Sequence, residues 1–208
     1  MQECDVDISL IKKALLNCKT DKVLPFRFIS SAKYAPNLEP ELERLMFKCL
    51  RDKKTLNGRT AILLDVSYSM SLHKISAKSE LSRLEATTAL AMLIREVCED
   101  VDIYTFSKQV VQVPARHGFA LHDIIRNSQP NKDTVIGPAI NLINSKNYDR
   151  IITVSDGQTQ DKLPAPNSRF AYFINIASSK NGVGYKDGWQ NIDGWSESII
   201  DYITYLET

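Results

Sequence analysis

The residues best suited to chemistry directly follow an apolar run. The segment from Thr60 to Leu64 leads into Asp65, and serines stand two and four residues further on, at Ser67 and Ser69. An apolar run that ends in one carboxylate is typical of a buried strand entering a polar loop at its carboxyl end. In such a loop Asp65 supplies charge and the serines supply neutral oxygens. This donor set suits a hard divalent cation such as Mg²⁺ or Mn²⁺.

A second apolar run, residues 150–155, also ends in an acid, Asp156, and Thr134 lies in a polar loop before a helix expected to begin at Gly137. The carboxyl ends of parallel strands lie at one edge of an open α/β sheet. Asp65 and Asp156 would therefore meet in one crevice if their strands are neighbours or nearly so. Three loops that agree on one place favour a cation site over ordinary turns and helix caps. Taken alone, Thr134 can equally cap the helix at Gly137.

Hydrophobic periodicity predicts the elements that must position these residues. In the first quarter of the chain we expect helices over 5–19, 26–32 and 39–52. After the turn at Asn57-Gly58 we expect strands over 59–65, 101–106, 109–113, 150–155 and 169–176, helices over 80–98, 121–127, 137–143 and 195–206, and a long polar loop over 67–82. This alternation predicts an α/β fold, a mostly parallel sheet with helices on both faces over 55–208, preceded by a small helical appendage over 1–54.

Composition limits the classes of function. The 208 residues are 43% hydrophobic and carry a formal net charge of +1. This hydrophobic content is enough to bury one sizeable core without disulfides or structural metals. Near-neutral charge gives no whole-molecule attraction to nucleic acid or to an anionic membrane, and any such partner must be met by a local patch.

Cysteine usage and hydropathy indicate the compartment. No C-x-x-C pair occurs among Cys4, Cys18, Cys49 and Cys98, and the last three fall in expected helices. We therefore expect reduced, buried thiols and a reducing compartment. No stretch approaches about 18 continuous apolar residues, and the polar start is not typical of a signal peptide. The expectation is a soluble, cytoplasmic protein without a membrane partner.

An enzyme interpretation starts from the same Asp65. A strand that ends in an aspartate resembles the haloacid-dehalogenase-like phosphatases, in which a second carboxylate two residues later transfers protons. Ser67 occupies that position here, which removes a group worth about 10²–10⁴-fold in rate. The histidines, His73, His117 and His122, have no nucleophile motif beside them and are expected in loops or at the surface. We therefore expect a binding protein rather than an enzyme.

The five residues together resemble the metal-ion-dependent adhesion site of the von Willebrand factor A family, with its D-x-S-x-S pattern, distant Thr and distant Asp. The resemblance implies that the hydroxyls of Ser67, Ser69 and Thr134 bind the cation directly, while Asp65 and Asp156 bind it directly or through water. It also implies an open coordination position that attracts an acidic oxygen from a partner, either a protein carboxylate or a phosphate.

Four basic residues lie in or beside the site loops: Lys74, Lys78, Arg83 and Lys132. They form either a scattered solvated face or a set of contacts to RNA phosphates at the metal-bearing edge.

Three segments carry a narrower resemblance: residues 24–29 (LPFRFI), 35–40 (APNLEP) and 192–202 (IDGWSESIIDY). They are similar to parts of the Ro 60 kDa autoantigen, or TROVE-domain, family. That family joins a ring of helical repeats to a von Willebrand A domain and binds small noncoding and misfolded RNAs. Only residues 1–54 correspond to the ring here, so Y-RNA binding does not carry over.

The resemblance implies a divalent-metal-dependent binding module of a Ro-like ribonucleoprotein, without catalysis, and a separate helical-repeat subunit as a possible partner. The alternative is an adhesion or scaffold A domain that binds protein without RNA.

Overall fold

The computed structural model describes residues 6–77, 79, 81–130, 132–159, 161–177 and 188–208. Its internal contacts divide the chain into two compact units, Met1–Lys54 and Thr55–Thr208.

The first unit is helical. It contains α1 (Ile8–Leu16), α2 (Pro25–Tyr34), the 3-10 helix η2 (Pro36–Leu38) and α3 (Glu39–Leu50). The Asp7 side chain caps α1 by accepting a 2.8 Å hydrogen bond from the Ser9 amide, as expected for an acid at a helix start. An ion pair of 3.1 Å between Lys12 and Glu41 joins α1 to α3. Each helix contributes buried apolar residues: Ile11 from α1, Phe28 and Ile29 from α2, and Leu42, Leu45 and Met46 from α3.

The second unit is a six-stranded α/β sheet. Its strands are β1 (Leu56–Asp65), β2 (Cys98–Phe106), β3 (Val110–Val113), β4 (Arg150–Ser155), β5 (Phe170–Asn175) and β6 (Gln190–Asp193). They lie in the order β3-β2-β1-β4-β5-β6, and every pair is parallel except the antiparallel β2–β3 hairpin. The helices are α4 (Tyr68–Leu72), α5 (Arg83–Val97), α6 (Gly118–Arg126), α7 (Gly137–Asn144) and α8 (Ser198–Leu206).

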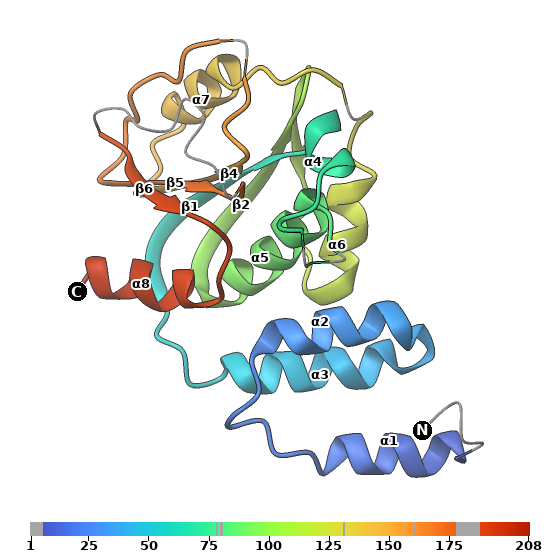
Figure 1. Cartoon of the computed structure of the whole chain (residues 1–208). Helices are drawn as coiled ribbons and strands as arrows, with labels where there is room; N and C mark the ends of the chain where they lie inside the picture. The colour runs from blue at the N-terminus through green and yellow to red at the C-terminus, as the bar shows by residue number, and fades with distance from the viewer. Residues whose placement is uncertain (1–5, 78, 80, 131, 160, 178–187) are drawn as a thin grey trace. The chain divides into compact units, whose positions relative to one another are not determined.

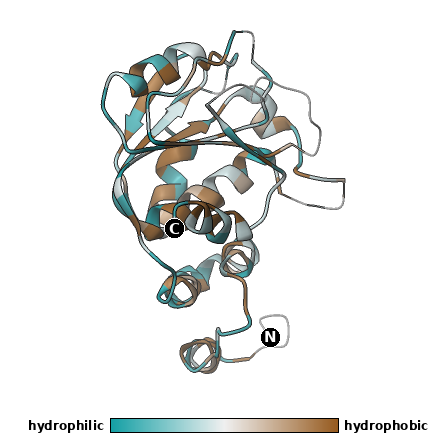
Figure 2. Cartoon of the chain, turned by 90° about the vertical axis from the view of Figure 1, so that its left-hand side faces the viewer, coloured by the Kyte–Doolittle hydropathy of each residue, from teal (hydrophilic) through white to brown (hydrophobic). Residues whose placement is uncertain are grey.

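Helices cover both faces of the sheet, with α7 on one side and α5 and α8 on the other (Figure 1). On the α7 side, one core cluster joins strand residues such as Leu63, Phe106 and Phe173 to Ile140 of the helix. Hydrophobic residues are frequent in the strands and in the helices beside them (Figure 2). Within the described residues, no helix has both the length and the apolar character needed to cross a membrane.

Strand register places the two acids of interest at one edge. Strands β1 and β4 are direct neighbours, paired from Thr60 with Arg150 to Leu64 with Val154. The next residues, Asp65 and Ser155, therefore end the two strands side by side, and Asp156 follows by one residue. This adjacency confirms the arrangement expected from the sequence.

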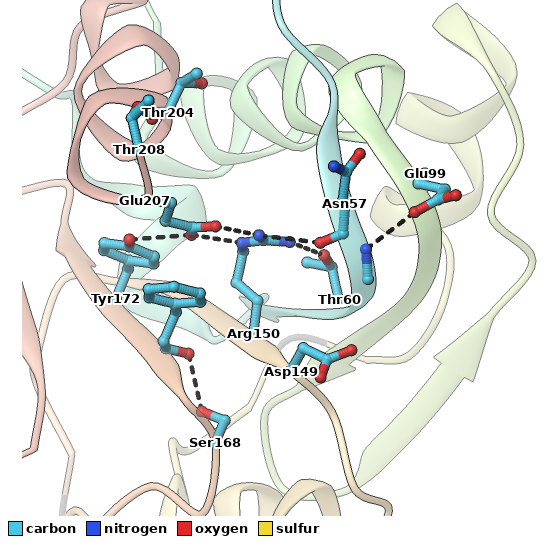
Figure 3. A network of polar contacts seen from close by, with 12 residues as sticks. Asn57, Thr60, Glu99, Asp149, Arg150, Ser168, Tyr172, Thr204, Glu207 and Thr208 are labelled. Carbon is cyan, nitrogen blue, oxygen red and sulfur yellow. Dashed lines mark hydrogen bonds and ion pairs between the residues drawn. The ribbon is translucent and has the colours of Figure 1, made fainter.

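A buried ion pair fixes the last helix to the opposite edge of the sheet (Figure 3). Arg150 donates from Nε to Glu207 Oε1 over 2.6 Å and from Nη1 to Thr60 Oγ1 over 2.7 Å, and its Nη2 also contacts Glu207. The hydroxyl of Tyr172 donates to the same carboxylate. The side chains of Arg150 and Glu207 are 2% and 7% exposed, so each buried charge depends on the other.

The structure corrects three local expectations. The polar loop expected over 67–82 contains the five-residue helix α4, too short for a periodic signal. Strand β6 was not expected because its four residues are mostly polar. Residue Cys98 begins β2 instead of ending a helix, because α5 leads into the strand without a loop. The acids Glu99 and Asp100 occupy exposed positions at the start of this strand. Acidic residues are more typical of turns, so the sequence did not indicate a strand there.

The expectation of buried thiols in helices also needs correction. Only Cys98 is buried; Cys18 and Cys49 are half-buried, and Cys18 follows α1 rather than belonging to it. Within the described residues, these three cysteines form no disulfide. Cys4 lies outside the described residues.

Candidate metal centre

The carboxylate of Asp65 is fully buried where β1 ends. The apolar strand carries it into the interior, and two neighbours satisfy its oxygens. The Ser67 amide donates to Oδ1 over 2.9 Å, and the Ser155 hydroxyl donates to Oδ2 over 2.6 Å. The second bond ties the end of β1 to the end of β4.

Burial disfavours the charge on this carboxylate. It raises the pKa of Asp65 to about 6, against the lowering effect of the hydrogen bonds from Ser155 and Ser67, and the charge of Asp156 raises the pKa further. The two aspartates are therefore electrostatically coupled. A divalent cation at this edge would relieve their repulsion and favour the ionised form of Asp65.

Two hydroxyls of the first loop lie together. Ser67 precedes α4 and is buried, and Ser69 lies in that short helix. Their Oγ atoms are 3.2 Å apart. The helical turn that follows Ser67 thus brings residues two apart in the sequence to one side of the loop.

The carboxylate of Asp156 is also fully buried, and it is held from two sides. Its Oδ1 accepts a 3.1 Å hydrogen bond from the Gln158 amide, and its Oδ2 forms a 2.7 Å ion pair with Nη1 of Arg83. Arg83 is the first residue of α5, whose start is fixed by a capping box between Ser82 and Glu85. Arg83 was expected on a surface patch, but its side chain is only 14% exposed.

Backbone and side-chain hydrogen bonds hold the Thr134 loop between the other two loops. The Tyr68 amide donates to the Lys132 carbonyl over 3.1 Å, which joins it to the first loop. On the other side, the Thr159 hydroxyl lies 3.3 Å from the Thr134 carbonyl and shares its proton between that carbonyl and the closer Asp161 carboxylate, which joins the Thr134 loop to the loop after β4. Thr134 itself is buried, at 7% exposure. The three loops predicted to converge are thus connected to one another.

The start of α7 is capped from a distance. Asp161 accepts hydrogen bonds from the Ile136 amide over 3.0 Å and the Gly137 amide over 2.6 Å. The capping role considered for Thr134 is therefore filled by Asp161. A Cβ atom at Gly137 would lie 2.7 Å from the Asp161 carboxylate, so glycine permits this approach. Burial opposes the charge of Asp161, but its hydrogen bonds from Thr159 and these amides outweigh that effect and lower the pKa of the carboxyl.

Sequence reasoning missed three residues of this edge: Ser155, Thr159 and Asp161. Ser155 was interpreted only as the last strand residue, although a hydroxyl beside Asp156 was a usable signal. Thr159 and Asp161 lie three and five residues after Asp156, and no sequence spacing indicates that they reach back to the Thr134 loop.

The other basic residues of the predicted patch remain at the surface. Lys74 and Lys132 are exposed, and Lys78 lies outside the described residues. Lys74 forms an isolated bridge with Ser82.

The donor set fits a hard divalent cation. Two buried carboxylates supply charge, and the hydroxyls of Ser67 and Ser69 supply neutral oxygens, the ligands that Mg²⁺ accepts. Across the described residues, no group of three or more His, Cys, Asp or Glu could hold a metal ion. Hydroxyl oxygens would therefore complete the coordination, and an all-oxygen donor set favours hard cations over soft ones.

Comparisons with known proteins give the fold. No protein-family model matches the chain, and no curated protein sequence does. Among solved structures, the Ro (RSR) protein of Deinococcus radiodurans aligns with a TM-score of 0.62 at 14% identity, over 83% of this chain and 39% of that chain. This chain therefore matches well under half of that protein, and the similarity shows a von Willebrand A-like, Rossmann-like fold.

Two other solved structures align less well. An aerotolerance-related membrane protein of Bacteroides fragilis gives a TM-score of 0.44 at 20% identity, over 62% of this chain and 69% of that one. The conserved hypothetical protein BatB of Bacteroides thetaiotaomicron gives 0.47 at 17% identity, over 71% and 95%.

Proposed function

We propose that the chain is a divalent-metal-dependent binding module that captures an acidic oxygen of a partner. The observation that carries the proposal is the pair of fully buried carboxylates, Asp65 and Asp156, at the ends of adjacent strands. Burying two coupled acids is costly unless something compensates their charge. Arg83 compensates the charge of Asp156, and a bound divalent cation would compensate the charge of Asp65.

In the proposed mechanism, the hydroxyls of Ser67, Ser69 and Thr134 would hold a divalent cation, and the two aspartates would balance its charge. When bound, the cation supplies a Lewis-acidic position for an incoming carboxylate or phosphate oxygen. Because hydroxyls are neutral ligands, Ser67, Ser69 and Thr134 would leave more positive charge available to that oxygen than carboxylate ligands would. Ser155 holds the Asp65 carboxylate, and Thr159 and Asp161 hold the Thr134 loop, so these residues keep the three loops in place.

We propose binding without turnover. A phosphatase that uses Asp65 as nucleophile needs a second acid two residues later. Ser67 occupies that position, and its backbone amide donates a hydrogen bond to Asp65. The residue lacks the acid–base group that such chemistry requires.

The chain is proposed to be a module of a Ro-like ribonucleoprotein that handles noncoding or misfolded RNA. Support comes from the fold shared with the Deinococcus Ro protein and from the Ro-like segments of the sequence. The last of these segments contains Trp195, whose indole Nε1 donates to the Ala86 carbonyl of α5 over 3.0 Å. Trp195 therefore helps to fix α5, the helix that carries Arg83.

The test is capture from a cell extract with the full chain immobilised, in Mg²⁺ and in excess chelator, with RNA and protein both identified. We expect a partner that is retained in Mg²⁺, lost in chelator and lost with Asp65→Asn. Bound noncoding RNA or an RNA-binding protein supports the ribonucleoprotein role, whereas an RNA-free protein partner favours the adhesion or scaffold role. Hydrolysis of a phosphate ester that disappears with Asp65→Asn would contradict binding without turnover.

A further inference from the structure

A permanent positive charge lies inside the proposed cation site. The guanidinium of Arg83 contacts Asp156, and arginine stays protonated in proteins. When ionised, Asp65 and Asp156 carry two negative charges between them, and Arg83 cancels one. A divalent cation that approaches this edge therefore meets about half of the attraction that two free aspartates would offer.

The contact between Arg83 and Asp156 uses a single nitrogen. Nη1 makes the 2.7 Å ion pair, while Nε is buried and has no hydrogen-bond partner in the part of the chain that the structure describes. The strongest arginine–carboxylate pairs use two parallel hydrogen bonds. The side chain thus neutralises Asp156 without the geometry that would hold it there most firmly.

The backbone of Arg83 is fixed, whereas among the described residues its side chain makes one hydrogen bond, to Asp156. The capping box of Ser82 and Glu85 defines the first turn of α5, and the Trp195 indole bonds to Ala86 three residues later. Any displacement of the guanidinium from Asp156 therefore involves side-chain rotation and leaves the helix in place.

We propose that Arg83 is an internal countercharge that sets the affinity of this site for divalent cations. With Arg83 paired to Asp156, the edge is stable without metal and binds a cation weakly, so that occupancy follows the free cation concentration. This inference rests on the proposed function, because it concerns the regulation of the same site.

The experiment is calorimetric titration of Mg²⁺, and separately Mn²⁺, into the full chain. Four proteins are compared: wild type, Arg83→Gln, Arg83→Met and Arg83→Lys. We expect the two neutral variants to bind Mg²⁺ at least about tenfold more tightly than wild type, and Arg83→Lys to stay within about threefold of it because the charge is kept.

Arg116→Gln is the matched control, because it removes the same charge at an exposed position after β3, towards the amino end of β2. Its Mg²⁺ affinity should equal that of wild type. The neutral variants are first checked for folding by circular dichroism, and the Met variant retains the packing of the aliphatic stem if the Gln variant does not fold.

Equal or weaker Mg²⁺ binding by folded Arg83→Gln and Arg83→Met would overturn the inference while leaving the metal site intact. Absence of Mg²⁺ binding by wild type and by both neutral variants would overturn the proposed function and the inference together. Tighter binding by Arg116→Gln to the same extent as by Arg83→Gln would also overturn the inference, since net charge alone would then explain the effect.

Discussion

The hydroxyl of Ser155 donates a 2.6 Å hydrogen bond to Oδ2 of Asp65, and this bond crosses from the end of β4 to the end of β1. Ser155 also accepts a 3.1 Å hydrogen bond from the Gly157 amide. One buried hydroxyl therefore orients the first aspartate and shapes the loop that carries the second.

Removing this hydroxyl tests its role. We expect Ser155→Ala to lower the free energy of unfolding by about 1–3 kcal/mol, because a buried carboxylate oxygen and a buried amide lose their partner. Metal affinity should fall by about 10–100-fold, the usual range for a group that orients a ligand. Urea unfolding measures the first effect and Mg²⁺ titration the second. A variant as stable as wild type and unchanged in Mg²⁺ affinity would contradict this role.

The distant cap of α7 gives a prediction with a defined pH dependence. Asp161→Asn should cost about 1–2 kcal/mol at pH 7, because the amides of Ile136 and Gly137 lose a charged acceptor. Hydrogen bonds lower the pKa of Asp161 in the folded protein below its ordinary value of 3.8. Its charged form thus stabilises the fold above pH 3.8, and this contribution is lost as pH falls through the folded pKa.

The difference in unfolding free energy between wild type and Asp161→Asn should therefore be full at pH 7 and shrink as pH falls below about 4. Urea unfolding at several pH values measures it. A difference that does not change with pH, or that grows in acid, would show that the charge of Asp161 does not hold the helix start.

Disrupting the buried ion pair between Arg150 and Glu207 is expected to have a larger effect on stability. Glu207→Gln should lower the free energy of unfolding by about 3–5 kcal/mol, because it leaves the Arg150 guanidinium buried without a compensating charge. The double variant Arg150→Met with Glu207→Leu should recover part of this loss, since neither charge is then buried. A loss below about 1 kcal/mol in Glu207→Gln would mean that water reaches Arg150 readily.

Thiol reactivity tests the placement of Cys98. Burial raises the pKa of the Cys98 thiol to about 11, so almost no thiolate exists there at pH 8. Alkylation at pH 8 followed by mass spectrometry should modify the half-buried Cys18 and Cys49 and leave Cys98 unmodified until the protein is unfolded in urea. Modification of Cys98 as fast as that of Cys18 would contradict its burial in β2.

Much of the fold was predictable because the strands of the second unit are long apolar runs. Strand β4 was predicted with its observed bounds, and β1 and β5 nearly so, since central strands of a parallel sheet are apolar on both faces. Elements without such a signal were missed, such as α4 and the polar edge strand β6. Cys98 was misplaced because helix and strand meet there without a turn.

The candidate site also contains features that were predictable from the sequence and features that were not. Asp65 and Asp156 were predicted to share one edge because each ends an apolar run, and the register of β1 with β4 confirms this adjacency. The ion pair of Arg83 with Asp156 and the reach of Asp161 to α7 depend on where loops fold back in space. The spacing of residues along the chain does not predict such contacts between residues far apart in the sequence.

The edge formed by Asp65, Asp156 and three hydroxyls is proposed to bind a divalent cation. Calorimetric titration of Mg²⁺ into wild type, Asp65→Asn, Thr134→Ala and Asp156→Ala tests it most directly, with Ser145→Ala, an exposed hydroxyl at the end of α7, as the matched control. We predict one saturable site in wild type and in the control, and affinity reduced by at least about tenfold in each of the other three variants. Unchanged Mg²⁺ binding in Thr134→Ala and Asp156→Ala, or no binding by wild type, would contradict the account.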